Sequence, residues 1–400
     1  MPVTLASSPA PLPKRDLSHA RRRTLAIAGL AHALHDGYTD LIYVLLPVWQ
    51  SEFTLDYTVL ALLRGLYAGS MAALQVPAGR LAERIGGRAV LAMGTGLAAL
   101  GYVLAGCSGG LLGLCVALAL SGAGSSTQHP IASGAVSRAY GSAARGPLGT
   151  YNFSGDLGKA ALPAATSLLL TLMPWRHALW LLAALGFAVS AAVALLMPST
   201  GRVQVDDEAS GHAAEGSGRG GFALLFAIGV LDTGVRMGLL TFLPFLLKAK
   251  GASLTTVGSA LALVFIGGAG GKFACGWLGA RLGVLRTVLL TEGGTAALIF
   301  SVLALPLAPA LLLLPLLGVM LNGTSSVLYG TMPELAPSGR AERAFAIFYT
   351  GTIGSGAVAP VLYGVLGDAV GAGWATTATA VTALATFPLA LALAPKLVRT

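Results

Sequence analysis

The sequence has 400 residues, of which 55% are hydrophobic and only 10% are charged, and its formal net charge is +9. Because soluble proteins are about 25% charged, this composition excludes an ordinary soluble enzyme or binding domain. The apolar residues form continuous runs of about 20, which cross a hydrocarbon layer as helices, and runs without alternation exclude a membrane β-barrel. We therefore predict an all-α polytopic membrane protein.

The excess of positive charge does not predict nucleic-acid binding. The basic residues lie in short segments between apolar runs, where they set the topology of a membrane protein. The three cysteines, Cys107, Cys115 and Cys275, lie in or at the end of apolar runs without paired spacing. No disulfide framework, metal site or cofactor is predicted from them.

Twelve transmembrane helices in two six-helix halves are expected along the chain. The N-terminal residues 1–23 are basic and rich in Pro and Ser but lack an apolar core, which indicates a cytoplasmic tail rather than a signal peptide. A polar, Gly-rich cytoplasmic linker at 198–220 separates an N-terminal half, 24–197, from a C-terminal half, 221–397. The predicted spans are 24–49, 57–80, 88–107, 110–138, 144–173, 176–197, 221–248, 253–281, 286–305, 307–333, 341–368 and 373–395.

The distribution of Lys and Arg predicts the orientation. With the N-terminus inside, 18 of the 25 basic residues fall in cytoplasmic segments, 3 fall in outer segments and 4 lie within spans. Because cytoplasmic loops carry the excess of positive charge, both termini are expected in the cytoplasm.

The two halves carry an internal repeat. The charged loop Gly79–Arg88 recurs as Gly276–Arg286, a shift of 197 residues (276 − 79), with Arg84 on Arg281 and Gly86 on Gly283. Pro47 and Pro163 recur at the same shift, as Pro244 and Pro360. Parallel six-span halves of this kind are the organisation of the major facilitator superfamily.

The same loop, Gly79-Arg-Leu-Ala-Glu83-Arg84-Ile-Gly86-Gly-Arg88, resembles the signature of that superfamily between its second and third spans. A narrower resemblance comes from Ala31-His-Ala-Leu-His-Asp36 and from Gly122-Ala-Gly-Ser-Ser-Thr-Gln-His129-Pro130. Together with Gly155-Asp-Leu-Gly158, these segments are similar to the fosmidomycin-resistance branch of bacterial efflux permeases. That resemblance implies a protein of the bacterial inner membrane that exports small drug-like or metabolite molecules in exchange for protons.

The first span carries a stripe of polar residues that predicts a site. His32, Asp36, Asp40 and Tyr43 lie on one helical face, and ionisable groups at this depth normally face a cavity or a partner. We predict that Asp36 or Asp40 takes up and releases the coupled proton. The alternative is that one of them only pairs with a base such as Arg64. Arg64 itself can be a substrate contact, a carboxylate partner or a snorkelling anchor.

Further ionisable residues have two readings each. Asp156 with Lys159, and Asp232 with Arg236, can form local ion pairs on one helix or take part in binding. His129, beside the helix-breaking Pro130, can titrate near neutral pH or only hydrogen-bond. Pro130 itself predicts a kink in the fourth span. Lys272 and Glu292 are expected to pair across their helices.

The resemblance to the superfamily implies that the charged loop acts as a cytoplasmic gate. Its residues are Gly79, Glu83, Arg84, Gly86 and Arg88, with Arg281 and Gly283 in the second copy. Glu83 is predicted to accept hydrogen bonds from the N-terminus of the eleventh span, near Arg340 and Arg343, when the transporter opens outward.

We therefore predict a secondary active transporter, not an enzyme, which exports small molecules by alternating access and proton antiport. Its expected partners are a small-molecule substrate, protons and the lipid bilayer, with no nucleic acid, and it is expected to be a monomer. Two alternatives remain open: proton-coupled import of a small organic anion through Arg64, Lys159, Arg236 and Lys272, or a membrane sensor that has lost transport.

Overall fold

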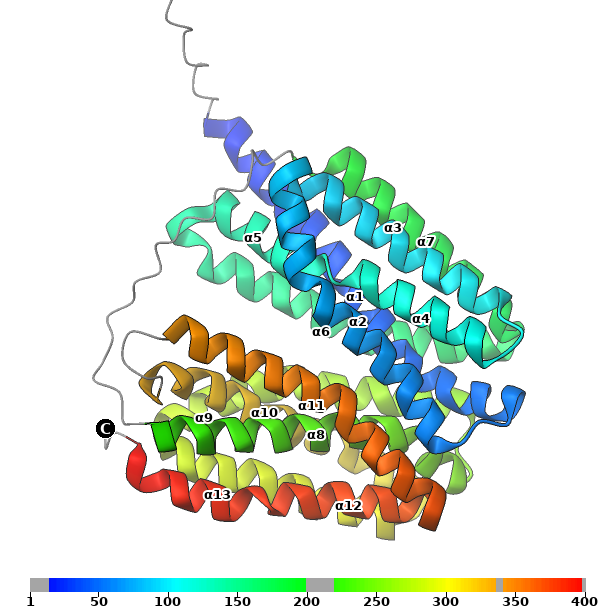
Figure 1. The fold of residues 1–400 in the computed structure, drawn as a ribbon, viewed down its shortest axis with the longest axis vertical. Coiled ribbons are helices and arrows are strands. Elements are labelled where there is room, and N and C mark those ends of the chain that lie inside the picture. Colours follow the sequence, from blue (N-terminus) through cyan, green and yellow to red (C-terminus); the bar gives the residue numbers. More distant parts are fainter. Residues whose placement is uncertain (1–13, 199–218, 336–340, 398–400) are drawn as a thin grey trace, which may run out of the picture.

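The computed structural model describes residues 14–198, 219–335 and 341–397. Its helices form two groups that lie side by side (Figure 1). The N-terminal group contains α1 (Lys14–Phe53), α2 (Tyr57–Ile85), α3 (Gly87–Cys107), α4 (Leu111–Ser125), α5 (Gln128–Tyr140), α6 (Arg145–Leu172) and α7 (Trp175–Leu196). The C-terminal group contains α8 (Arg219–Ala249), α9 (Leu254–Ala304), α10 (Leu307–Leu335), α11 (Ala341–Val370), α12 (Ala372–Leu384) and α13 (Thr386–Leu393).

The prediction of an all-α polytopic membrane protein is confirmed by this architecture. Ten segments of the described helices are long and apolar enough to cross a membrane. The two long helices outside that set, α1 and α6, carry the ionisable residues His32, Asp36, Asp40, Asp156 and Lys159. Charged and polar side chains lower the mean hydropathy of a helix. These ionisable residues therefore make α1 and α6 less apolar than the other membrane-spanning helices.

Two segments differ from the predicted tail and linker. The helix α1 begins at Lys14, so residues 14–23 are helical instead of forming a separate tail. The remaining tail residues, 1–13, and residues 199–218 of the predicted linker lie outside the described residues.

The glycines of the repeated loop make the turns between helices. Gly86 separates α2 from α3 with a φ of 93°, and Gly283 breaks α9 with a φ of 77°. Glycine adopts positive φ without the steric cost that a side chain would add. The two copies of the loop therefore share one backbone conformation, which explains why Gly occurs at both positions.

The predicted fourth span is interrupted near its middle. The helix α4 ends at Ser125 and α5 begins at Gln128, with Pro130 in the first turn of α5. Proline is tolerated there because the first N–H groups of a helix have no partner within it. The predicted kink is therefore present, and it places His129 at the beginning of a new helix.

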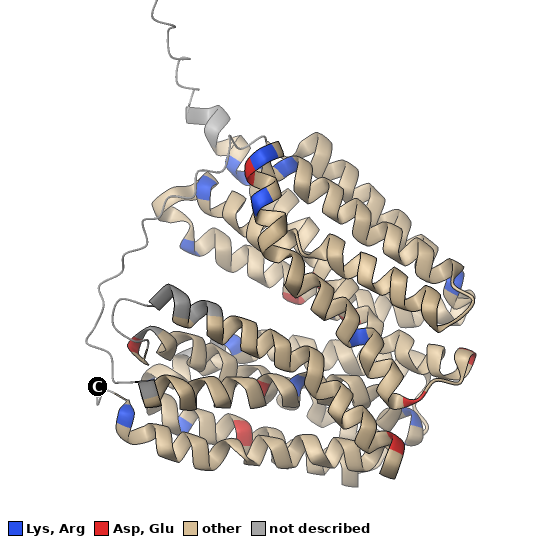
Figure 2. Cartoon of the chain, in the orientation of Figure 1, with Lys and Arg blue, Asp and Glu red and all other residues tan. Residues whose placement is uncertain are grey.

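The two groups touch each other through α2 with α11 and α6 with α9. We call the two ends of the bundle the short-loop end and the linker end. The short-loop end holds the tight connections at 54–56, 108–110, 173–174, 250–253 and 305–306; the linker end holds residues 141–144, 198 and 219. Figure 2 shows Lys and Arg gathered at the linker end of the N-terminal group.

The contacts between the groups are close at the short-loop end. A side chain at Gly364 would lie 2.8 Å from the Cα of Thr58, and one at Gly258 would collide with Ser167. The ring of Tyr57 lies 5.1 Å from that of Phe245, edge to face. Small residues that let helix backbones approach are typical of packing within membranes.

An acidic side chain completes this end. The carboxylate of Asp368, on α11, accepts hydrogen bonds from the backbone N–H of Tyr57 at 2.7 Å and of Thr58 at 3.0 Å. It also accepts one from the Thr58 hydroxyl. The first N–H groups of α2 are thus capped by the opposite group of helices, where the helix dipole favours a negative charge.

Candidate functional site

A cavity of about 260 Å³ lies between the two groups of helices. It is lined by residues of α1, α2, α5 and α6 on one side and α8, α9, α10 and α11 on the other. Seven of the ten residues predicted for the cavity line it: Asp36, Asp40, Arg64, His129, Asp156, Lys159 and Arg236. The other three, His32, Tyr43 and Asp232, lie behind its wall and contact it through their neighbours.

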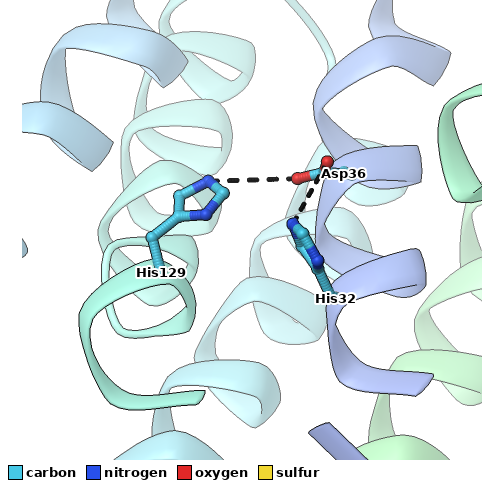
Figure 3. A group of neighbouring side chains, drawn as sticks. All are labelled: His32, Asp36 and His129. Atoms are coloured by element: carbon cyan, nitrogen blue, oxygen red, sulfur yellow. Dashed lines mark ion pairs between the residues drawn. The ribbon is translucent and has the colours of Figure 1, made fainter. Parts of the chain in front are cut away.

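Asp36 is the centre of a cluster of ionisable groups on the cavity wall. Its carboxylate lies 3.2 Å from the Nζ of Lys159, 3.3 Å from the Nε2 of His32 and 3.9 Å from the Nε2 of His129. Figure 3 shows the two imidazole rings approaching the carboxyl group from different helices. The cluster therefore joins α1, α5 and α6 through one acidic group.

The ring of His32 is held by a second acceptor. Its Nδ1 lies 2.9 Å from the carbonyl oxygen of Tyr151, and the ring stacks on that tyrosine with centroids 4.2 Å apart. Both ring nitrogens thus face oxygens that accept hydrogen bonds, an arrangement that the doubly protonated ring satisfies fully.

His32, Asp36 and His129 also offer ligand atoms within 4.8 Å of one another, near enough to hold a metal ion. The ammonium group of Lys159 already lies 3.2 Å from Asp36. A divalent cation bound to this carboxylate would be repelled by that ammonium group, so the donor set does not fit a metal ion.

An ion pair crosses between the two groups of helices. The Nζ of Lys272, on α9, lies 2.6 Å and 2.9 Å from the two carboxylate oxygens of Asp156, on α6. Lys159 lies farther from Asp156, at 3.8 Å. The local pair predicted between Asp156 and Lys159 is therefore the weaker of the two. The expected pair between Lys272 and Glu292 is wrong, because Lys272 faces the opposite group of helices.

Arg64 is buried in the cavity wall beside Asp40 and Tyr43. Only 4% of the residue is exposed, which excludes the snorkelling anchor among its three interpretations. Its Nη2 lies 4.0 Å from the nearest oxygen of Asp40, and its guanidinium lies over the Tyr43 ring, 5.1 Å from the centroid. Asp40 is thus a distant partner, beyond hydrogen-bonding distance.

A second acidic pair lies in the C-terminal group. Asp232 on α8 and Glu292 on α9 are both buried and interact with each other, and Glu292 also interacts with Thr324. Two neighbouring carboxyl groups repel each other when both are ionised, so the pair is electrostatically coupled.

The repeat explains where this pair lies. At the shift of 197 residues, Asp232 corresponds to His35 and Glu292 to Thr95. In the N-terminal group, His35 hydrogen-bonds to the hydroxyls of Thr95 and Ser125, each at 3.0 Å. A shift of 196 residues would instead match Asp232 with Asp36. The shift of 197 agrees with the structure, in which Asp232 lies behind the cavity as His35 does.

The charged loop lies away from the cavity, at the linker end. Glu83, Arg84 and Arg88 are exposed, and Arg88 donates to the carbonyl of Met197 at 3.4 Å. Gly79 is half-buried near the end of α2, and Arg281 stacks on the Trp277 ring one turn before it. Glu83 makes no ion pair among the described residues, and the residues just before α11, with which the latch is predicted, lie outside that part of the chain. Arg340 and the side chain of Arg343 lie outside the described part of the chain.

Three residues that contribute to these arrangements were not singled out by the sequence analysis. Asp368 caps α2, Asn322 accepts a hydrogen bond from Arg236 at 3.4 Å, and Thr324 interacts with Glu292. The repeat carried a signal for two of them, because at the shift of 197 residues Asn322 is the counterpart of Ser125 and Thr324 lies two residues beyond it. For Asp368 no local pattern in the sequence indicates the partner.

Comparisons with known proteins agree with this architecture. The sequence model of the Major Facilitator Superfamily matches residues 28–224 and again 224–399. A bacterial homolog of the human lysosomal transporter Spinster, in an inward-facing and occupied conformation, superposes with a TM-score of 0.78 at 15% identity over 97% of this chain and 98% of that one. The same homolog, inward-facing and unoccupied, gives 0.77 at 15% identity over 94% of this chain and 98% of that one.

No curated protein sequence matches this chain. At 15% identity the structural likeness concerns the fold alone. The two matches to the family model together span nearly the whole chain, one for each group of helices. The chain therefore belongs to the Major Facilitator Superfamily, and it is a multi-pass membrane transporter.

Proposed function

We propose that the protein exports small drug-like or metabolite molecules from a bacterium in exchange for protons, through alternating access of the central cavity. The observation that carries this proposal is the position of Asp36, on the cavity wall and within 4.0 Å of Lys159, His32 and His129. A carboxyl group that faces both a cavity and exchangeable bases can take up a proton when the cavity opens to one side and release it on the other.

The resemblance of the first, fourth and fifth spans to fosmidomycin-resistance permeases supports export. We place the protein in the inner membrane with the linker end in the cytoplasm, which follows the distribution of Lys and Arg. In that orientation the close contacts at the short-loop end shut the cavity from the outside. The conformation described here then corresponds to the inward-facing state, as in the two superposed transporters.

Reconstitution into proteoliposomes tests the proposal. A pH gradient across the membrane should drive flux of compounds to which a sensitised host becomes resistant on expression of the protein. Asp36→Asn should abolish the dependence of flux on the gradient, because the amide cannot carry the proton. Asp56→Asn is the matched control, since Asp56 is exposed and its side chain caps nothing.

Gradient-driven flux that is equal in the wild type and in Asp36→Asn would contradict the role of this carboxyl group. The absence of gradient-driven flux with every compound in the resistance panel would contradict proton-coupled export as a whole.

Uptake of a small organic anion is a second candidate, favoured by Arg64 and Arg236, which line the cavity from opposite groups of helices. The direction of the imposed gradient separates the two candidates. Export requires that protons and substrate move in opposite directions, whereas accumulation of an anion requires that they move together.

A further inference from the structure

Two guanidinium groups in the cavity wall have hydrogen-bond donors without acceptors. The Nε and Nη1 atoms of Arg64 are buried and have no partner among the described residues, and neither has the Nε of Arg236. Arg64 comes from α2 and Arg236 from α8, so the two arginines reach one cavity from opposite groups of helices. Arginine presents five donors and stays protonated in proteins, so these donors call for an acceptor.

The carboxylates of the cavity are for the most part already occupied. Asp36 lies 3.2 Å from Lys159, and Asp156 lies 2.6 Å from Lys272. Asp40 remains for the arginines, and its nearest approach to Arg64 is 4.0 Å. No carboxylate lies within 4.0 Å of the Arg236 side chain among the described residues. The arginines are therefore incompletely paired.

The acidic pair behind the wall does not change this conclusion. Asp232 interacts electrostatically with Arg236 but lies outside the cavity lining, where it is coupled to Glu292. The side chain of Arg236 is instead oriented by the amide oxygen of Asn322, a neutral acceptor at 3.4 Å. A neutral acceptor fixes the guanidinium without neutralising it, which leaves its charge available to a ligand.

Burying a charge without a close counter-charge costs several kcal/mol, and an orphaned donor adds to that cost. An anion bound between the arginines would supply the missing counter-charge, because the planar guanidinium matches the two oxygens of a carboxylate or a phosphonate. The remaining wall includes the apolar side chains of Met71, Leu240, Phe265 and Ile353, which suit an apolar body.

We propose that Arg64 and Arg236 form an oxyanion subsite for a small organic anion, a carboxylate or a phosphonate, whose apolar part lies against Met71, Leu240, Phe265 and Ile353. This proposal rests on the cavity being the transport site, and it holds for either direction of transport. Asp40 acts in it as a competing anion beside Arg64, which weakens binding and so permits release.

Equilibrium binding to the purified full-length protein tests the subsite. Phenylphosphonate and benzoate serve as anionic probes, and benzamide is the neutral probe of the same shape. We expect one or both anions to bind measurably by calorimetry and benzamide not to bind. The phosphonate and benzoate arms identify the preferred oxyanion.

Variants of the subsite should change anion binding in opposite directions, and a variant outside it serves as the control. Arg64→Gln and Arg236→Gln should each weaken binding about tenfold or more, the effect of losing a charge-assisted hydrogen bond. Asp40→Asn should tighten it by about threefold or more, because it removes the competing charge. Arg176→Gln, whose arginine pairs with Glu52 at the short-loop end, should leave binding unchanged. Binding of neither anion, or equal binding of benzamide, would overturn the proposal.

A second measurement does not depend on the choice of probe. Met71→Cys, made in a chain whose Cys107, Cys115 and Cys275 are replaced by Ser, places a thiol on the cavity wall. We expect this thiol to react faster with a sulfonate-bearing methanethiosulfonate than with its trimethylammonium analogue, relative to their rates with a free thiol. Arg236→Gln should lower that ratio by about fivefold.

The oxyanion subsite and the proposed function can be rejected independently of each other. If neither arginine variant changes the ratio of the reaction rates of the two reagents, the oxyanion subsite is rejected and proton-coupled transport is not. Anion binding that depends on the arginines, found together with an absence of gradient-driven flux, keeps the subsite and removes the proposed function.

Discussion

The residues of the candidate site show what a helical stripe predicts and what it does not. The spacing of Asp36 and Asp40 on α1 placed both on one face, and both line the cavity. A repeat alignment shifted by 196 instead of 197 residues would match Asp232 to Asp36 rather than to His35. Because one residue rotates a helix by about 100°, this error exchanges a position in the cavity for one behind it.

Pairings of side chains between helices could not be predicted from the sequence. Lys272 was matched with Glu292 because their spans are adjacent in the chain, but its partner is Asp156 on α6. Periodicity indicates which residues share a face of one helix, whereas the helix opposite that face is decided by packing of the whole bundle. The repeat recovers part of this information, since His35 and Thr95 are in contact as are their counterparts Asp232 and Glu292.

The acidic pair leads to a prediction about single residues. Glu292→Gln should unfold within about 1 kcal/mol of the wild type, because the amide can still donate to Asp232 and accept from Thr324. Glu292→Leu should cost about 1–3 kcal/mol more, since it leaves buried partners unsatisfied. Thermal unfolding of the purified protein in detergent measures both. Glu334→Leu, at an exposed position of α10, controls for the change to leucine. Equal losses in the Gln and Leu variants at 292 would show that Asp232 and Thr324 do not need a polar partner at this position.

At the scale of the elements, turns were more predictable than contacts. Gly86 and Gly283 mark the ends of helices in the sequence, and their positive φ values explain the residue type. The break between α4 and α5 follows from Pro130. The cap on α2 by Asp368 could not be predicted, because the two partners are separated by most of the chain and neither belongs to a recognisable pattern.

The Asp368 cap holds two elements from opposite groups together, which makes it testable. Asp368→Asn keeps the shape of the side chain but removes the charge that the N-terminus of α2 favours. We expect the short-loop end to open in a larger fraction of molecules, by about tenfold, for a loss of about 1.4 kcal/mol. Spin labels at Thr54 and Gly373, both exposed, should report a longer distance. Asp56→Asn lies in the same connection without bonding to α11, and an identical effect of that variant would argue against a specific cap.

At the scale of the whole molecule, composition and the repeat were sufficient for the fold. Runs of apolar residues predicted helices across a membrane, and the shift of 197 residues predicted two related groups, each of which matches the family model separately. The conformation was not predictable, because both open states of a transporter satisfy the same apolar pattern. It depends on a few polar contacts at the two ends, such as Asp368 with α2 and the predicted latch of Glu83 with α11.

These two contacts should oppose each other in the balance between the states of the molecule. Asp368 stabilises closure of the short-loop end. In the same conformation the exposed Glu83, at the linker end, has no ion pair in the described part of the chain. If Glu83 bonds to α11 only when the linker end closes, Glu83→Ala should favour the present conformation, whereas Asp368→Asn should disfavour it.

Labels at Ser142 and Glu334, on opposite groups at the linker end, report closure there. The double variant should return toward the wild-type distribution, because distant and independent contacts add. Anion affinity should change little in Glu83→Ala, which lies outside the cavity lining. Shifts of the two single variants in the same direction would show that the ends are not coupled through one rocking motion.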